Sequence, residues 1–389
     1  MKYNFDKMTN RRDTNSLKWD IQDNELPMWV ADMDFEIAPE IKEALYQRVE
    51  HGIFGYNNVP YDFFASISNW WETYHHFEMN EEWMMFCTGV VPAISSIVRK
   101  LTKIGDNILI LSPVYNIFYN SILNNERYVL PSNLVYNGIE YSIDFNDLEK
   151  KLSEPKTTMM IFCNPHNPIG KIWDKETLEK VGDLCNKYHV LILSDEIHCD
   201  IVEPGYEYIP FLSVSEQIKN NIITCIAPTK AFNLAGLQCA CIVVPNKELR
   251  DKVNRGINTD EVAEPNSFAC LASIAAFEKG KKWLSELNIY IQRNREIAMQ
   301  YIEKQIPSLH IVSSHATYLL WIDCTDIAED SKMLTYFIRE YTGLYVTNGE
   351  EYGDNGKGFI RINIACPQVR LMDGLERLKN GITLYQQSY

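Results

Sequence analysis

The stretch IITCIAPTKAFNLAGL, residues 222–237, is the most informative part of this 389-residue chain. Its apolar first half predicts a buried strand, Ala-Pro-Thr-Lys predicts a turn, and the last residues predict the start of a helix. Lys230 stands in the turn, just after the strand. A lysine there can lose its hydration, so that its pKa falls and its amine captures a carbonyl as a Schiff base. Taken alone, an exposed loop lysine is the more common case.

Four further apolar runs share the character of this strand, because they are nearly continuous in apolar residues rather than alternating. They are NILILSP, TTMMIFCNP, HVLILSDEIH and CACIVVP, at residues 107–113, 157–165, 189–198 and 239–245. Such strands are typical of a parallel sheet covered on both faces. Between two of them, residues 174–189 have helical spacing, with Asp174 as the N-cap. This alternation predicts an α/β domain with right-handed crossovers.

The pattern changes after about residue 280. Residues 283–306 predict one long amphipathic helix, and ATYLLWIDC and GFIRINIA predict two strands separated by a helical segment. The first forty-odd residues are irregular, and we expect them to wrap the body or to pack with the C-terminal domain. We predict an N-terminal arm with part of the small domain (1–47), a large cofactor-binding α/β domain (48–285) and a smaller C-terminal α+β domain (286–389).

Composition excludes several classes of partner. The net charge of −15 argues against binding to nucleic acid or to an anionic membrane surface. No run approaches the ~20 apolar residues of a membrane span, and the first residues lack a signal-peptide core. The ten cysteines are scattered in apolar segments without a CxxC pair, so we expect reduced core thiols, no metal site and a cytoplasmic protein.

Polar residues follow several predicted strands. Asp195 comes directly after HVLILS, at the sheet edge where open α/β sheets bind ligands, although a helix cap is an equally good interpretation. In CNPHNPIG, Asn167 lies in a rigid turn at the same edge and can present its amide to a ligand oxygen. Tyr115 follows another strand through a Ser-Pro turn; it can stack on a planar ligand, or simply pack.

Two anion sites complete the pattern. TGVVPAIS, beginning at Thr88, predicts a helix start whose free N–H groups suit a phosphate. Arg361 lies inside an apolar strand, where its planar fork suits a carboxylate, with a structural salt bridge as the alternative. Together with a Schiff-base lysine, a buried carboxylate, an amide and an aromatic ring, these features match what pyridoxal phosphate requires.

The motifs TGVVPAIS, SPVYNIFY, NPHNPIG, SDEIHCD, APTKAFNLAGL and GFIRINIACP resemble, in this order, those of fold-type I pyridoxal-phosphate enzymes, the aminotransferase superfamily. PMWVADMDF, FGYNNVP and SDEIHCD are similar to the MalY/PatB-type C–S lyases, also called cystathionine β-lyases. The resemblance implies an aminotransferase-like fold: a large domain with a mostly parallel sheet flanked by helices, plus a smaller α+β domain. It also implies bound pyridoxal 5′-phosphate and a homodimer with shared active sites.

The resemblance assigns expected roles to individual residues. Lys230 would carry the cofactor, Asp195 would pair with its ring nitrogen, Asn167 would lie near its ring oxygen, and Tyr115 would stack on the ring. The implied phosphate ligands are Gly89, Val90, Val91, Thr229 and, from a second subunit, Tyr56.

Substrate binding and two departures from the wider superfamily follow from the same resemblance. Arg361 would bind the substrate α-carboxylate, helped by the backbone at Ala31 and by Asn167. His198, also expected beside the cofactor, stands where many aminotransferases have tyrosine, and Gln238 where many have an arginine for the phosphate. Both departures favour the lyase branch.

The implied reaction is an α,β-elimination that cleaves the C–S bond of cystathionine or a related S-substituted cysteine. Lys230 removes the α-proton, the sulfur leaves as a thiol (homocysteine from cystathionine), and pyruvate and ammonia remain. The preferred substrate and the acid that protonates the sulfur stay open. The alternatives are a class I/II aminotransferase and a non-catalytic regulatory protein; the latter is expected to lack Lys230 or Asp195, and both are present.

Overall fold

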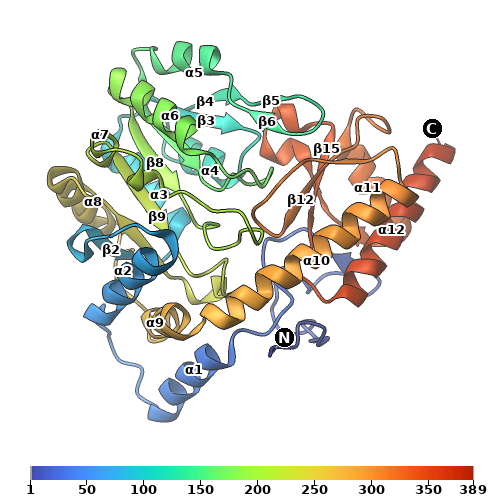
Figure 1. Ribbon diagram of the computed structural model, residues 1–389, viewed down its shortest axis with the longest axis horizontal. Helices are drawn as coiled ribbons and strands as arrows, with labels where there is room; N and C mark the ends of the chain where they lie inside the picture. Colours follow the sequence, from blue (N-terminus) through green and yellow to red (C-terminus); the bar gives the residue numbers. More distant parts are fainter. Residues whose placement is uncertain (1, 389) are drawn as a thin grey trace.

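A seven-stranded sheet forms the centre of the larger part of the molecule (Figure 1). The computed structural model describes residues 2–388. The sheet order is β2 (Met84–Cys87), β10 (Ala240–Val243), β9 (Ile222–Ile226), β8 (Leu191–Asp195), β7 (Thr157–Cys163), β3 (Asn107–Ser112) and β4 (Tyr128–Asn133). The five apolar runs predicted as buried strands are therefore confirmed as β3, β7, β8, β9 and β10.

Strand direction differs from the prediction at one place. β10 is antiparallel to both of its neighbours, β2 and β9, whereas the pairs from β9 through to β4 are all parallel. Six of the seven strands thus point the same way, and a mostly parallel sheet is confirmed. The prediction that CACIVVP forms a parallel strand is wrong, because a continuous apolar run reports burial on both faces and not direction.

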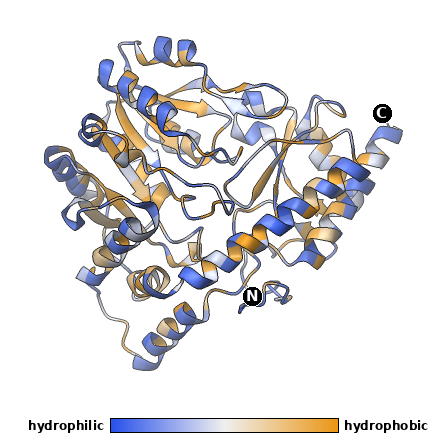
Figure 2. Ribbon diagram, viewed as in Figure 1, coloured by the Kyte–Doolittle hydropathy of each residue, from blue (hydrophilic) through white to orange (hydrophobic). Residues whose placement is uncertain are grey.

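Both faces of the sheet are covered by helices. Along β3, Ile108 and Ile110 pack into one apolar cluster, while Leu109 and Leu111 pack into the other. One cluster includes residues of α3 (Val90–Leu101), α4 (Ile117–Leu123) and α8 (Lys247–Thr259). The other includes residues of α2 (Tyr61–His75), α5 (Phe145–Leu152), α6 (Lys175–Lys187), α7 (Glu216–Lys219) and α9 (Ala269–Lys279). Figure 2 shows the result, with apolar strands inside and polar outer helix faces.

The predicted helix with Asp174 as its cap is confirmed as α6. The Asp174 carboxylate accepts a hydrogen bond from the backbone N–H of Thr177 at 2.8 Å, which satisfies a free donor of the first turn. Leu178, Val181 and Cys185 are the buried residues of its apolar stripe.

The long helix α10 (Lys281–Gln305) runs from the larger to the smaller part of the molecule (Figure 1). The smaller part has an antiparallel sheet in the order β11 (His310–Ile311), β12 (Leu319–Asp323), β15 (Phe359–Asn363) and β14 (Thr347–Asn348). Its helices are α11 (Ser331–Thr342) and α12 (Gln368–Ser388). A two-stranded ribbon, β5 (Val135–Tyr136) and β6 (Tyr141–Ser142), forms a separate sheet that packs on the smaller one, where the Trp321 indole N–H donates to the Tyr141 hydroxyl at 3.2 Å.

The N-terminal segment packs with the C-terminal part, one of the two arrangements expected for it. β1 (Leu26–Pro27) pairs in parallel with β13 (Leu344–Tyr345), and α1 (Pro39–His51) follows. The expected domain limits near residues 47 and 285 fall inside α1 and α10, and as limits of folding units they stay predictions.

The helices and the cysteines bear on the predictions about membranes and disulfides. None of the helices within residues 2–388 combines the length and the apolar character that a membrane span requires. All ten cysteines lie among the described residues, and each is buried with a free thiol.

Candidate active site

Strand ends deliver the predicted site residues to one edge of the large sheet. Gly89, Tyr115, Asn167, Asp195 and Lys230 stand at or just after the ends of β2, β3, β7, β8 and β9, which all point the same way. A cavity of about 250 Å³ lies there. The predicted residues that line it are Ala31, Gly89, Val90, Val91, Tyr115, Asn167, Asp195, His198, Thr229 and Lys230.

Two predicted residues do not line this cavity. Arg361, on β15, reaches its edge through a hydrogen bond from Nη1 to Oδ1 of Asn167 at 3.1 Å. Its Nη2 donates to the carbonyl of Trp29 at 2.9 Å, and its Nε is buried without a partner among the described residues. Tyr56 lies between α1 and α2 and is fully exposed, so its expected role depends on a second copy of the chain.

Lys230 lies at the centre of the site and is partly exposed to the cavity. Its Nζ donates a hydrogen bond to the carbonyl of Ala31 at 2.7 Å. Burial, and then the positive charge of Arg361, lowers the pKa of Lys230 from 10.5 to about 8, against the opposing effect of Asp32 and Asp195. A larger fraction of this lysine is therefore a neutral amine at neutral pH than of an exposed lysine.

Asp195 is the last residue of β8 and is buried. Burial raises the pKa of its carboxyl to about 6, although the backbone N–H of Ile197 and the charge of Lys230 both lower it. Its Oδ1 accepts the Ile197 N–H at 3.1 Å. Residues 197–200 form a turn and not a helix, so the helix-cap interpretation of Asp195 is wrong. Within residues 2–388 the charge of Lys230 stabilises this carboxylate, but burial outweighs it.

The start of α3 supplies a site for an anion. Gly89 is its N-cap, and the first backbone N–H groups of a helix have no acceptor within the helix. Together with the positive end of the helix dipole, these groups favour a phosphate. Thr229 and Gln238 line the same region of the cavity wall.

Tyr115 and His198 are neutral polar groups in the cavity wall. Burial raises the pKa of Tyr115 to about 12, so its hydroxyl stays protonated. Burial, with the charges of Lys230 and Arg361, lowers the pKa of His198 to about 3. The Nδ1 of His198 has no hydrogen-bond partner within the described part of the chain, so it is free for a ligand.

The turn that carries Asn167 is held by close packing. Gly170, at φ +64°, ends this turn, and a Cβ there would lie 2.7 Å from the carbonyl oxygen of Ala316. A glycine is therefore required at this position, both for its backbone conformation and for the contact with the smaller part of the molecule.

Several aromatic residues near the site were not predicted. The hydroxyl of Tyr318 donates to the Ala31 carbonyl at 3.0 Å, and the Tyr352 ring lies 4.8 Å from the Arg361 guanidinium. Trp29 belongs to PMWVADMDF, which did signal the lyase resemblance, whereas Tyr318 and Tyr352 carry no distinguishing pattern.

These groups have the chemistry that pyridoxal phosphate requires. Lys230 offers an amine for its aldehyde, and the helix start offers N–H donors for its phosphate. A protonated ring nitrogen would give buried Asp195 the cationic partner that its raised pKa shows to be missing. The residues present therefore fit this cofactor.

Comparison with known proteins gives close full-length matches. The chain is 38% identical over 386 residues to cystathionine beta-lyase PatB of Bacillus subtilis, covering 98% of this chain and all of PatB. A PLP-bound putative aminotransferase from Clostridium difficile has a TM-score of 0.95 at 37% identity, covering 98% of this chain and 100% of that one. A PLP-bound C–S lyase from Staphylococcus hominis, complexed with L-cycloserine, has a TM-score of 0.92 at 31% identity, with 98% of each chain covered.

The family model for class I and II aminotransferases matches residues 26–378, which include both sheets and every predicted site residue. This protein belongs to the class I and II aminotransferase family.

Proposed function

We propose that this protein is a pyridoxal-phosphate-dependent lyase that cleaves the C–S bond of cystathionine or a related S-substituted cysteine. The products would be pyruvate, ammonia and a thiol. The full-length similarity to a cystathionine beta-lyase and to a PLP-bound C–S lyase supports this proposal. The observation that carries it is the Lys230 amine, with a pKa lowered to about 8, in the same cavity as Asp195.

Lys230 would have two tasks. Its Nζ would bind the cofactor aldehyde covalently and, once released by the substrate amine, would remove the α-proton. A pKa of about 8 suits both, because a base works best when its pKa lies near the working pH. The carbonyl of Ala31, which accepts from Nζ in this structure, would orient the free amine.

Asp195 would hold a proton on the cofactor ring nitrogen, and the start of α3 with Thr229 would hold the phosphate. Bound pyridoxal phosphate would supply an electron sink for the pair left at Cα when its proton departs. Tyr115 and neutral His198 would shape the walls around the ring.

Arg361 would bind the α-carboxylate of the substrate. Its Nη1 and Nη2 are held by Asn167 and by the Trp29 carbonyl, which fixes the plane of the guanidinium. Its buried Nε lacks a partner among the described residues, so this edge is free to donate to an anion. A carboxylate bound there would lie close to the amide of Asn167.

The main competing function is amino transfer, which the similarity to a putative aminotransferase favours. The two reactions share the proton removal by Lys230 and differ in the next step, because the lyase would lose the β-sulfur of the substrate whereas an aminotransferase would return the proton to the cofactor. Incubation with cystathionine and pyridoxal phosphate, without any keto acid, separates them. The lyase releases pyruvate continuously, whereas an aminotransferase stops after about one turnover because no amino acceptor is present.

We also propose a homodimer in which Tyr56 reaches the phosphate site of the partner copy. The full exposure of Tyr56, together with exposed Ile53 and Phe54 in the same segment, supports it, because apolar groups gathered on a surface mark an interface. A cytoplasmic location stays a prediction.

A further inference from the structure

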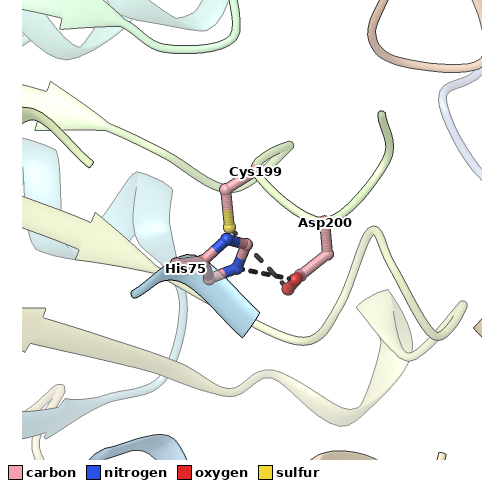
Figure 3. Close-up of side chains that lie close together, drawn as sticks. All are labelled: His75, Cys199 and Asp200. Carbon is pink, nitrogen blue, oxygen red and sulfur yellow. Dashed lines mark hydrogen bonds and ion pairs between the residues drawn. The ribbon is translucent and has the colours of Figure 1, made fainter. Parts of the chain in front are cut away.

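A cluster of metal-ligating side chains lies outside the active-site cavity. The turn that follows β8 carries His198 and then Cys199 and Asp200, which approach His75 at the end of α2. Figure 3 shows these three side chains converging from two segments of the chain. One ligand atom from each, a nitrogen, a sulfur and an oxygen, lies within 4.8 Å of the others.

The three side chains are already in contact with one another. Nε2 of His75 lies 2.9 Å from Oδ1 of Asp200, and the Cys199 thiol donates to Oδ2 of Asp200 at 3.7 Å. Cys199 and Asp200 are buried, and the His75 side chain is only 9% exposed. The indole N–H of Trp70 donates to Oδ1 of Asp200 at 2.9 Å and so fixes the carboxylate.

No lysine or arginine of the described residues forms an ion pair with this cluster, although the charges of Lys281 and Asp200 attract each other across the neighbouring cavity. Among the described residues, Asp200 has an ion-pair contact with His75 alone. Lys281 lines the neighbouring cavity, but its ammonium lies over the Tyr74 ring at 3.7 Å. A buried carboxylate whose ion-pair partner is a single histidine favours a further cation, since burial of an incompletely balanced negative charge is costly.

We propose that His75, Cys199 and Asp200 form a zinc-binding site. Zn²⁺ takes imidazole nitrogen, thiolate sulfur and carboxylate oxygen, and often keeps a water on a fourth position. The adjoining cavity of about 340 Å³ is lined by all three residues and has room for that water. On binding, the Cys199 S–H bond breaks, a Zn–S bond forms, and the proton passes to solvent.

A zinc ion at this site would restrain the turn that carries His198. Cys199 directly follows His198, whose ring lines the cofactor cavity, whereas His75 belongs to α2. A zinc ion bound by all three would tie the turn to that helix. The inference does not depend on the proposed lyase activity, because it concerns metal content.

The direct test is the zinc content of the full chain, purified with its cofactor, after dialysis against zinc and then against metal-free buffer. The proposal predicts about one zinc per chain. Cys199→Ser and His75→Asn should lose it, while Cys185→Ser, at another buried cysteine, should keep it. Trp70→Phe, which removes the donor to Asp200 and keeps an aromatic ring in the core, should weaken zinc affinity about tenfold.

A cobalt-substituted sample gives a second readout, which Cys199 would not produce if it served only to pack the core. Bound Co²⁺ should show a thiolate-to-metal absorption band that is absent in Cys199→Ser and present in Cys185→Ser. If Cys199→Ser fails to fold, His75→Asn tests the same site. Zinc absent from the native chain, or equal in the native chain and both ligand variants, would overturn the proposal.

Discussion

Arg361 and Asn167 meet through a 3.1 Å hydrogen bond although they belong to different parts of the molecule. Asn167 lies in the turn after β7 of the large sheet, and Arg361 lies within β15 of the small sheet. The residue expected to bind the substrate carboxylate therefore contacts the residue expected beside the cofactor ring. With these expected roles, substrate binding and cofactor orientation would be linked through this hydrogen bond.

Replacing Arg361 with lysine tests the carboxylate site. Arg361→Lys keeps the positive charge but loses the planar fork and the paired contacts to Asn167 and the Trp29 carbonyl. We expect kcat/KM for cystathionine to fall about 10- to 100-fold, mainly through KM. The exposed Arg293→Lys is the matched control. An unchanged KM would exclude Arg361 from substrate binding.

The pKa of Lys230 predicts how cofactor capture depends on pH. Only the neutral amine attacks the aldehyde, so the rate at which cofactor-free protein takes up pyridoxal phosphate should rise about tenfold per pH unit and level off above about pH 8. Stopped-flow absorbance measures this rate.

Arg361→Leu serves as the paired variant in the same experiment. Because the charge of Arg361 lowers the pKa of Lys230, its removal should move the midpoint to higher pH. A rate that keeps rising to pH 10 in the native chain would show that Lys230 has an ordinary pKa.

Asp195→Asn should separate stability from activity. The folded-state pKa of Asp195, about 6, lies above its ordinary value of 3.8, so its contribution to stability is complete below pH 4 and is lost as pH rises through 6. Without cofactor at pH 7, Asp195→Asn should therefore be more stable than the native chain by about 1 to 3 kcal/mol. At pH 4 the difference should disappear.

Urea unfolding at the two pH values measures this effect, with the exposed Asp183→Asn as the control. Turnover should change in the opposite sense, falling about 10²- to 10³-fold, because the asparagine cannot hold the ring nitrogen protonated. A less stable variant at pH 7 would mean that the buried carboxylate is stabilised by a partner in the cofactor-free protein.

Local sequence patterns predicted the α/β fold class and four residues of the cavity wall, Tyr115, Asn167, Asp195 and Lys230. The family resemblance added Ala31, Gly89, Val90, Val91, His198 and Thr229. Asp195 and Lys230 could be placed because each follows a continuous apolar run, and parallel strands bring their carboxyl ends to one edge. The direction of β10 could not be predicted, since burial on both faces does not depend on direction. Contacts such as Tyr318 with Ala31 join segments 287 residues apart, so only tertiary packing determines them.

The cluster of His75, Cys199 and Asp200 could not be predicted either, because it also joins segments that lie far apart in the sequence. Cys199 and Asp200 are adjacent, but their partner lies more than a hundred residues earlier in α2, and no spacing motif connects them. The sequence predicted scattered reduced cysteines and no metal, and that expectation is what the zinc experiment addresses.

Mixed dimers test the expected role of Tyr56. Tyr56→Ala and Lys230→Ala should each be nearly inactive alone. If Tyr56 completes the site of the partner copy, a mixed dimer has one intact site, so an equal mixture that exchanges subunits freely should regain about a quarter of native activity. Activity assays before and after mixing measure this. No recovery, with subunit exchange verified by mass, would place Tyr56 outside a shared site.

The most direct measurement of the central claim is the yield of pyruvate and free thiol from cystathionine, with pyridoxal phosphate present and no keto acid. The account predicts continuous release of both in about equal amounts by the native chain. It predicts a loss of turnover of at least about 10²-fold in Lys230→Ala, which lacks the base. Amino transfer to an added keto acid without thiol release, or undiminished turnover in Lys230→Ala, would contradict it.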